Sequence, residues 1–212
     1  MPAIVYKNKE GVRLPSVTTI TGILSKRALL VWANNIGLQG IIMKDYVDNL
    51  ADIGTLAHHM VSSRIKKAEP VFDKYSSEQI ELAKQCYLKY VVWESRNNVE
   101  YIDSELSLIS EKHGFGGTLD IPMVLNGKKT LVDLKTGKAV YDDYFLQVAG
   151  GYLLLSDENS LGIESSAILR IGRTEDEGIE AEFKPIENQD LWQKLFLQCL
   201  DVYKTKKELK FN

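Results

Sequence analysis

The most constraining feature of the chain is an Asn126-Gly127 pair between two extended stretches, 117–125 and 128–135. Asn-Gly between alternating residues is the strongest short-range signal for a β-hairpin with a two-residue type I′ turn. Counting back from that turn along both strands places Asp120 directly opposite Asp133. The sequence therefore predicts two carboxylates side by side in a sheet.

Two opposed carboxylates need compensation, because like charges on paired strand positions are destabilising at a Cβ separation of roughly 5 Å. Lys135 projects from the same face as Asp133, since strand side chains alternate in direction. The candidates for compensation are this lysine and a divalent cation. Mg²⁺ or Mn²⁺ bound by a few carboxylates could polarise a phosphodiester and lower the pKa of water. The alternative is an exposed hairpin whose charges only keep a sheet edge soluble.

Short motifs occur in a fixed order between about residues 14 and 155. They are Leu14-Pro15-Ser16-Val17-Thr18-Thr19-Ile20, Ile53-Gly54-Thr55-Leu56-Ala57-His58, Gly117-Thr118-x-Asp120, Val132-Asp133-Leu134-Lys135-Thr136-Gly137 and Tyr144-x-x-Gln147. Together they resemble the RecB-like branch of the PD-(D/E)xK nuclease superfamily, and especially its phage and mitochondrial-type exonucleases.

The resemblance implies a set of metal ligands and a catalytic lysine. His58, Asp120 and Asp133 would hold the metal together with the backbone carbonyl of Leu134, and Lys135 would be the catalytic lysine. His58 is followed directly by a second histidine, His59. On a helix His59 points about 100° away from His58 and is therefore the less suitable ligand.

Further residues are additional candidates for the site. Glu105 could stand in for an upstream acid of some relatives, although a surface role fits its position equally well. Gln147 would lie near the substrate or the lysine, with Tyr144 on the same helical face. Relatives often carry a tyrosine four residues after the glutamine, where this chain has Gly151 and then Tyr152. On a regular α-helix Tyr152 would point to a different face from Gln147.

Periodicity, caps and turns predict an α/β protein formed by a single domain over residues 1–212. Residues 1–99 would be mainly helical and carry the histidine motif, and 100–212 would form the sheet core with the remaining motifs. As the resemblance implies, the fold would be a restriction-endonuclease-like α/β sandwich, a mixed central sheet flanked by helices with an N-terminal helical region. Helices are expected over about 17–24, 28–48, 52–67, 77–97, 141–156 and 189–207, and strands over 100–110, 117–125, 128–135, 165–171 and 179–185.

Charge and cysteine content limit the partners. The net charge is −3, which does not suit a nucleic-acid binder, but residues 1–40 hold five basic residues and one acidic residue. The acidic residues are concentrated in 173–190, so the charge distribution still permits a positively charged groove on one side of the molecule and an acidic surface on the other. The two cysteines, Cys86 and Cys199, read as buried, and an iron-sulfur cluster that needs four cysteines is excluded. No apolar run suggests a membrane span or signal peptide, so the expected location is cytoplasmic. The resemblance to phage enzymes also allows a phage origin.

These observations predict a deoxyribonuclease that uses Mg²⁺ or Mn²⁺. The function expected from the resemblance is an exonuclease acting on single- or double-stranded DNA ends in replication, recombination or repair. Two alternatives remain open: a structure-specific endonuclease, and a non-catalytic DNA-binding protein that retains the fold. The sequence leaves cleavage polarity and oligomeric state open.

Overall fold

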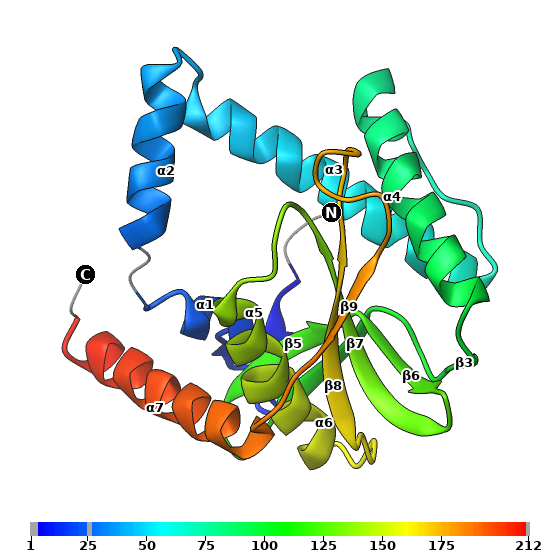
Figure 1. Cartoon of the computed structure of the whole chain (residues 1–212). Helices are drawn as coiled ribbons and strands as arrows, with labels where there is room; N and C mark the ends of the chain where they lie inside the picture. Colours follow the sequence, from blue (N-terminus) through cyan, green and yellow to red (C-terminus); the bar gives the residue numbers. More distant parts are fainter. Residues whose placement is uncertain (1–3, 25–26, 211–212) are drawn as a thin grey trace.

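A five-stranded mixed sheet forms the centre of the computed structural model, which describes residues 4–24 and 27–210. The strand order is β3-β6-β7-β8-β9; β7 and β8 run parallel, and the other neighbours are antiparallel. Helices cover both faces (Figure 1), so the predicted fold class, a mixed sheet flanked by helices, is confirmed. The strands are β1 (Tyr6–Lys7), β2 (Arg13–Leu14), β3 (Val99–Tyr101), β4 (Leu106–Ser110), β5 (Phe115–Leu119), β6 (Ile121–Leu125), β7 (Lys128–Thr136), β8 (Ser165–Ile171) and β9 (Glu182–Pro185).

Two helical layers enclose the sheet, and alternate residues of its central strands point into each layer. Leu131 and Ile168 pack toward η1, α6 and α7, whereas Val132 and Leu169 pack toward α3 and α4. This alternation follows from the two-residue period of a strand and explains why β7 and β8 are apolar on both faces. The helices are α1 (Val17–Thr21), α2 (Arg27–Leu38), α3 (Met43–Lys66), α4 (Ser77–Ser95), α5 (Asp142–Phe145), η1 (Leu146–Tyr152), α6 (Leu153–Glu158) and α7 (Gln189–Glu208).

The predicted hairpin register is confirmed. β6 pairs with β7 from Leu125↔Lys128 to Ile121↔Val132. Asn126 and Gly127 have φ values of 51° and 84°, the positive angles that a type I′ turn requires. The two aspartates therefore lie one position beyond the last paired residues.

The predicted continuous strands 100–110 and 117–125 are wrong, because both bend at the same place. Glu105 adopts φ 55°, a left-handed conformation that interrupts the first strand. Its N–H donates to the carbonyl of Asp120, 2.8 Å away, at the break between β5 and β6. Beyond the bend β4 and β5 form their own two-stranded sheet. Such irregularities re-aim side chains and are frequent beside active sites.

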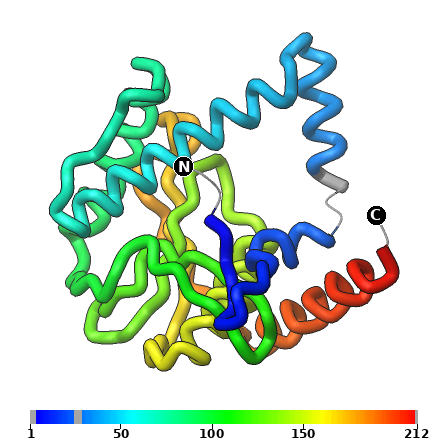
Figure 2. The backbone as a smooth tube through the Cα atoms, turned by 180° about the vertical axis from the view of Figure 1, so that it is seen from behind, coloured from blue at the N-terminus to red at the C-terminus, as the bar shows by residue number. Residues whose placement is uncertain are grey.

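The N-terminal helices also differ from the expected ranges. The predicted helices 28–48 and 52–67 are wrong in their division, because α2 ends at Leu38 and α3 runs unbroken from Met43 to Lys66. Gly40, at φ 76°, makes the turn between them. Figure 2 shows α2 and the first part of α3 projecting from the body of the molecule. Lys26, one of the basic residues in the predicted positive region, lies outside the described residues.

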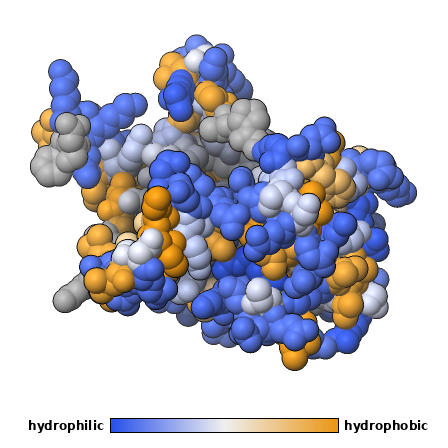
Figure 3. Space-filling view, turned by 90° about the horizontal axis from the view of Figure 1, so that it is seen from above, coloured by the Kyte–Doolittle hydropathy of each residue, from blue (hydrophilic) through white to orange (hydrophobic). Residues whose placement is uncertain are grey.

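Apolar side chains reach the surface in separate patches among hydrophilic ones on the face seen from above (Figure 3). Several exposed ones belong to α2 and the turn that follows it: Leu29, Leu30, Val31, Leu38, Ile41 and Ile42. Within residues 4–24 and 27–210, the helices include none with the length and apolar character needed to span a bilayer.

The expected helix 141–156 contains a π-helical turn that the sequence pattern did not predict. This turn, η1, lies between α5 and α6 and contains Gly150 and Gly151. A Cβ at Gly151 would lie 2.5 Å from a methyl carbon of Val17 on α1, and one at Gly150 would lie 2.8 Å from the Trp192 carbonyl on α7. The two glycines thus allow α1 and α7 to pack directly on the η1 backbone.

We expect Gly151→Ala to destabilise the protein by about 1–3 kcal/mol, because the new methyl would displace Val17 in a packed core. Gly37→Ala is the matched control. It lies in α2 with nothing within 4 Å of an added Cβ, and should stabilise the helix by about 0.5–1 kcal/mol. Urea denaturation of both variants measures the difference, and equal effects would contradict the packing of α1 on η1.

Candidate metal and catalytic site

Three side chains meet at the bend of the hairpins, one from α3 and two from the connections between β3 and β4 and between β5 and β6. His58 Nδ1 lies 3.5 Å from Asp120 Oδ2 and 3.8 Å from Glu105 Oε1. One potential ligand atom from each residue lies within 4.8 Å of the other two. An imidazole and two carboxylates at these separations can converge on one cation.

A glycine in α3 explains how His58 reaches this position. A Cβ at Gly54 would lie 2.9 Å from Oγ1 of Thr136 at the end of β7, so a larger residue would have to displace this hydroxyl or the helix. His58 follows one helical turn later and therefore lies over the same end of the sheet. His59 has a different role: its Nε2 accepts a hydrogen bond of 3.0 Å from the N–H of Val71.

Asp133 and Lys135 form a second charged pair on β7. Lys135 Nζ lies 2.7 Å from Asp133 Oδ2, and the Asp133 side chain is 1% exposed. Oδ2 of Asp133 is therefore paired with the lysine, whereas its buried Oδ1 has no hydrogen-bond partner among the described residues. Buried carboxylate oxygens are normally hydrogen-bonded or ligate a metal. Asp133 therefore has acceptor capacity for a cation, which is the feature expected of a metal ligand.

The cluster holds protons tightly in the protein without metal. Burial lowers the pKa of His58, but the charges of Asp120 and Glu105 outweigh it and raise that pKa to about 9. Burial and the neighbouring charge of Asp133 raise the pKa of Asp120 to about 7, against the opposing effect of His58. Asp120 also accepts a hydrogen bond of 2.9 Å from the backbone N–H of Leu134. A cation bound here would have to displace these protons.

Lys135 lies among aromatic side chains contributed by the segment after β7. Its Nζ is 5.1 Å from the centre of the Tyr144 ring. Burial lowers its pKa, but the charges of Asp133 and Asp120 reverse that effect and leave the pKa above the ordinary value. The lysine is therefore held in its charged form.

The expectation that Tyr152 faces away from Gln147 is wrong. Gln147 Nε2 donates a hydrogen bond of 2.7 Å to the Tyr152 hydroxyl. The reason is the π-helical turn, in which residues five apart come together, whereas an α-helix aligns residues three and four apart. Burial and the charge of Asp133 raise the pKa of Tyr152, so its hydroxyl is neutral. Gly117 makes room for the ring, since a Cβ there would lie 2.7 Å from a Tyr152 ring carbon.

Most of the predicted site residues lie together at one end of the sheet, but the residues nearest to His58 differ from the expected set. Glu105, predicted only as an additional candidate, joins His58 and Asp120 in the cluster, while Asp133 pairs with Lys135. The left-handed backbone of Glu105 had no clear signal in the sequence. The Leu134 carbonyl stays a prediction, and the contact seen at that residue is its N–H bond to Asp120.

Comparison with protein-family models and with curated proteins found no match. Among solved structures, the chain is similar to the alkaline exonuclease LHK-Exo from Laribacter hongkongensis, with 12% identity, a TM-score of 0.39, and coverage of 94% of this chain and 95% of that one. The structure of LHK-Exo in complex with dAMP is 14% identical in sequence, with a TM-score of 0.35 and coverage of 77% of this chain and 92% of that one. The structure of SSO0001 is 14% identical, with a TM-score of 0.34 and coverage of 73% of this chain and 74% of that one. At such TM-scores these similarities carry no argument about activity, which must come from the site.

The raised pKa of His58 makes stability depend on pH in the metal-free protein. The pKa of His58 is about 9 in the folded protein and 6.5 for an unperturbed histidine. Between these pH values the folded protein therefore binds a proton at His58 that the unfolded chain has lost. Its stabilising contribution is complete below about pH 6.5 and is lost as pH rises through about 9. We expect the stability advantage of the wild type over His58→Gln to shrink across this window in urea titrations with chelator. An advantage independent of pH there would contradict the ion pairing of His58.

Proposed function

We propose that this chain is a metal-dependent nuclease that hydrolyses phosphodiester bonds of DNA. The observation that carries the proposal is the convergence of His58, Glu105 and Asp120 beside a buried Asp133 whose Oδ1 accepts no hydrogen bond from described residues. A purely structural acid cluster would be expected to satisfy its oxygens with nearby donors. The order of motifs along the sequence supports the same reading.

The donor set fits a hard divalent cation such as Mg²⁺ or Mn²⁺. His58, Glu105, Asp120 and Asp133 would hold it, with the Leu134 carbonyl as a further ligand. When bound, the cation supplies Lewis acidity, which polarises the phosphodiester and lowers the pKa of water.

Lys135 would stabilise the negative charge that develops on the phosphate oxygens. Because Asp133 and Asp120 hold its pKa above the ordinary value, it carries a positive charge at neutral pH and is unsuited to remove a proton from water. Tyr144 borders the lysine, and the pair Gln147–Tyr152 supports that side of the site through a partly buried hydrogen bond. Gln147 and Tyr152 would therefore position Lys135 and the substrate.

Among nucleases, we favour an exonuclease that acts on DNA ends, as the sequence resemblance implies, with a structure-specific endonuclease as the alternative. A time course on end-labelled linear DNA and on circular single-stranded DNA separates them, since only an endonuclease cuts the circle. Lack of cleavage of any DNA with Mg²⁺ or Mn²⁺ would favour the third possibility, a non-catalytic DNA-binding protein.

Asp133→Asn should lower cleavage by at least ~10²-fold, because it removes a charged ligand from the site while keeping the shape of the side chain. The double variant Asp133→Asn/Lys135→Met removes both members of the ion pair, so no buried charge loses its partner. It should fold and be equally inactive, as measured by circular dichroism and a nuclease assay. The control is Glu100→Gln, an exposed acid on β3, which should retain wild-type activity. Near-normal cleavage by Asp133→Asn would refute the site.

Titration calorimetry with Mn²⁺ should separate the two adjacent histidines. His58→Ala removes one ligand of the proposed cation and should weaken binding by ~10-fold or more. His59→Ala removes only the bond to the Val71 N–H and should leave the affinity unchanged. If His59→Ala weakens binding and His58→Ala does not, the assignment of the histidine motif is wrong.

A further inference from the structure

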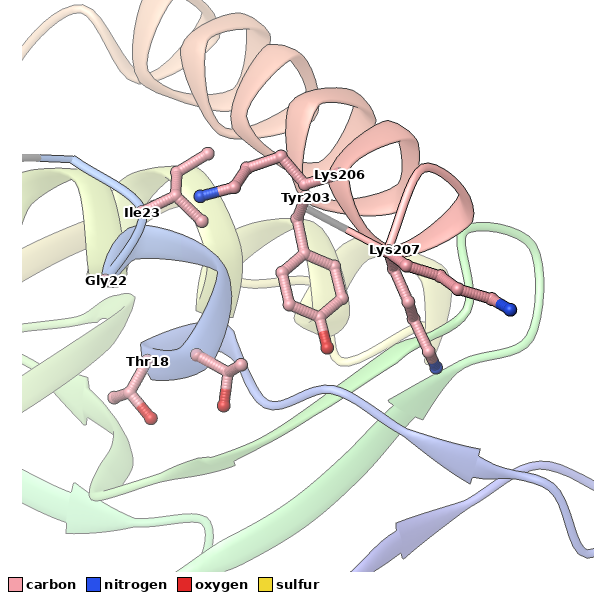
Figure 4. Close-up of a pocket in the computed structure, with 8 residues that line it drawn as sticks. Thr18, Gly22, Ile23, Tyr203, Lys206 and Lys207 are labelled. Carbon is pink, nitrogen blue, oxygen red and sulfur yellow. The ribbon is translucent and has the colours of Figure 1, made fainter. Parts of the chain in front are cut away.

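A pocket with a positively charged wall lies between α1 and the C-terminal part of α7. It is separate from the charge cluster, which is the group formed by His58, Glu105, Asp120, Asp133 and Lys135. It measures about 550 Å³, within the range of small-molecule sites. Figure 4 shows Lys206 extending toward Ile23, just after α1, with Tyr203 next to it and Lys207 on the other side of the tyrosine. The described lining residues are Thr18, Thr19, Gly22, Ile23, Tyr203, Lys206, Lys207 and Lys210.

A second pocket of about 380 Å³ adjoins the first, and the two share Thr19, Tyr203 and Lys207. It extends along the first β-hairpin, which β1 and β2 form, and its lining adds Arg13 of β2 and Ser16. The two pockets therefore lie side by side around Tyr203 and Lys207, and together they are called the hollow below.

The charge of this hollow has one sign. Four cationic side chains line it, namely Arg13, Lys206, Lys207 and Lys210, and none of its described lining residues is acidic. Lysines in the last turn of α7 also complement the negative end of that helix. That effect does not explain Arg13, which belongs to a different element, or the threonine hydroxyls that line the opposite wall. In a chain with a net charge of −3, such a concentration of cations indicates an anionic ligand.

The functional groups of the hollow select phosphate rather than a base. Ammonium and guanidinium groups and hydroxyls are the usual donors to phosphate oxygens. The described lining residues include no Asn, Gln, Asp or Glu, the side chains that most often read base edges besides arginine and lysine. A ligand held here would therefore be recognised through its backbone, independently of its sequence.

The hollow is connected to the charge cluster through a single packed layer. α1 packs against both α7 and η1, and Val17 of α1 lies directly over Gly151. The same π-helical turn carries Gln147 and Tyr152 beside the catalytic lysine. The hollow and the site therefore lie against the same packed layer.

We infer that the hollow between α1, α7 and the first β-hairpin binds consecutive phosphates of a nucleic-acid strand. This inference rests on the proposed function for its choice of nucleic acid as the polymeric phosphate. It adds a binding surface away from the metal ligands, and it places part of the affinity for substrate at the C-terminal end of α7.

The test measures binding of a fluorescent single-stranded oligonucleotide of ~16 nucleotides with chelator present, so that no cleavage occurs. Lys207→Ala/Lys210→Ala should weaken binding several-fold and make the slope of log K against log salt shallower by ~1.4, which is two single-strand phosphate contacts. The matched control is Lys84→Ala/Lys194→Ala, which changes the net charge equally at exposed lysines that do not line the hollow. It should leave the slope unchanged.

Equal losses in the two double variants would overturn the inference, because they would reflect net charge alone. Displacement of the oligonucleotide by a nucleoside monophosphate or inorganic phosphate at equal phosphate concentration would also overturn it, in favour of a small anionic ligand. Cleavage of a dinucleotide, whose single internucleotide phosphate is the scissile one and leaves none for the hollow, should be the same in the wild type and in Lys207→Ala/Lys210→Ala. The binding result stands whether or not the protein cleaves DNA, so the failure of the proposed function is seen separately.

Discussion

The crowding of three carboxylates at one bend of the sheet is the constraint on which the rest of the structure depends. Glu105, Asp120 and Asp133 approach one another at a place where the hairpins change direction, and the charge of Asp133 raises the pKa of Asp120. Two cations, His58 and Lys135, offset this repulsion in the protein without metal. Each comes from a position that the fold must supply: a helix lying close to β7, and the alternate position on β7 itself. The negative potential of the carboxylates therefore favours positive charge at the site, and a divalent cation could supply it.

The supporting layers keep these charges in place through close contacts between glycines and the side chains of neighbouring elements. Gly54 brings α3 against Thr136, and Gly117 leaves space for the ring of Tyr152. Neither contact tolerates a Cβ without displacement, so the geometry is set by packing rather than by the weak and screened attraction of surface ion pairs. The motif residues of the sequence are thus of two kinds. Some carry charge, and the glycines among them allow the elements to approach closely enough to bring the charges together.

Local chemistry predicted the hairpin, its register and the shared face of Asp133 and Lys135, because turn type and strand alternation are properties of adjacent residues. The mixed sheet with helices on both faces also followed from the order of elements. The bend at Glu105 and the division of the N-terminal helices could not be predicted, since both depend on single backbone angles that the hydrophobic period does not record. The contact between Gln147 and Tyr152 was missed for a related reason. A π-helical turn changes the residue spacing of a face, and only packing by α1 and α7 against the paired glycines indicates where it occurs.

The π-helical turn joins two regions of opposite charge. One of its faces carries Gln147 and Tyr152 toward Lys135, and its glycines contact α1 and α7, which form the cationic hollow. A nucleic-acid strand approaching an acidic chain meets repulsion from the carboxylate cluster unless a cation occupies it. Lysines and an arginine on the neighbouring layer can attract the strand without entering that cluster, where they would compete with the cation for the same carboxylates. If the chain holds a cation and a nucleic-acid strand as we propose, the packed layer of α1 and η1 would keep the cationic side chains of the hollow away from the carboxylates.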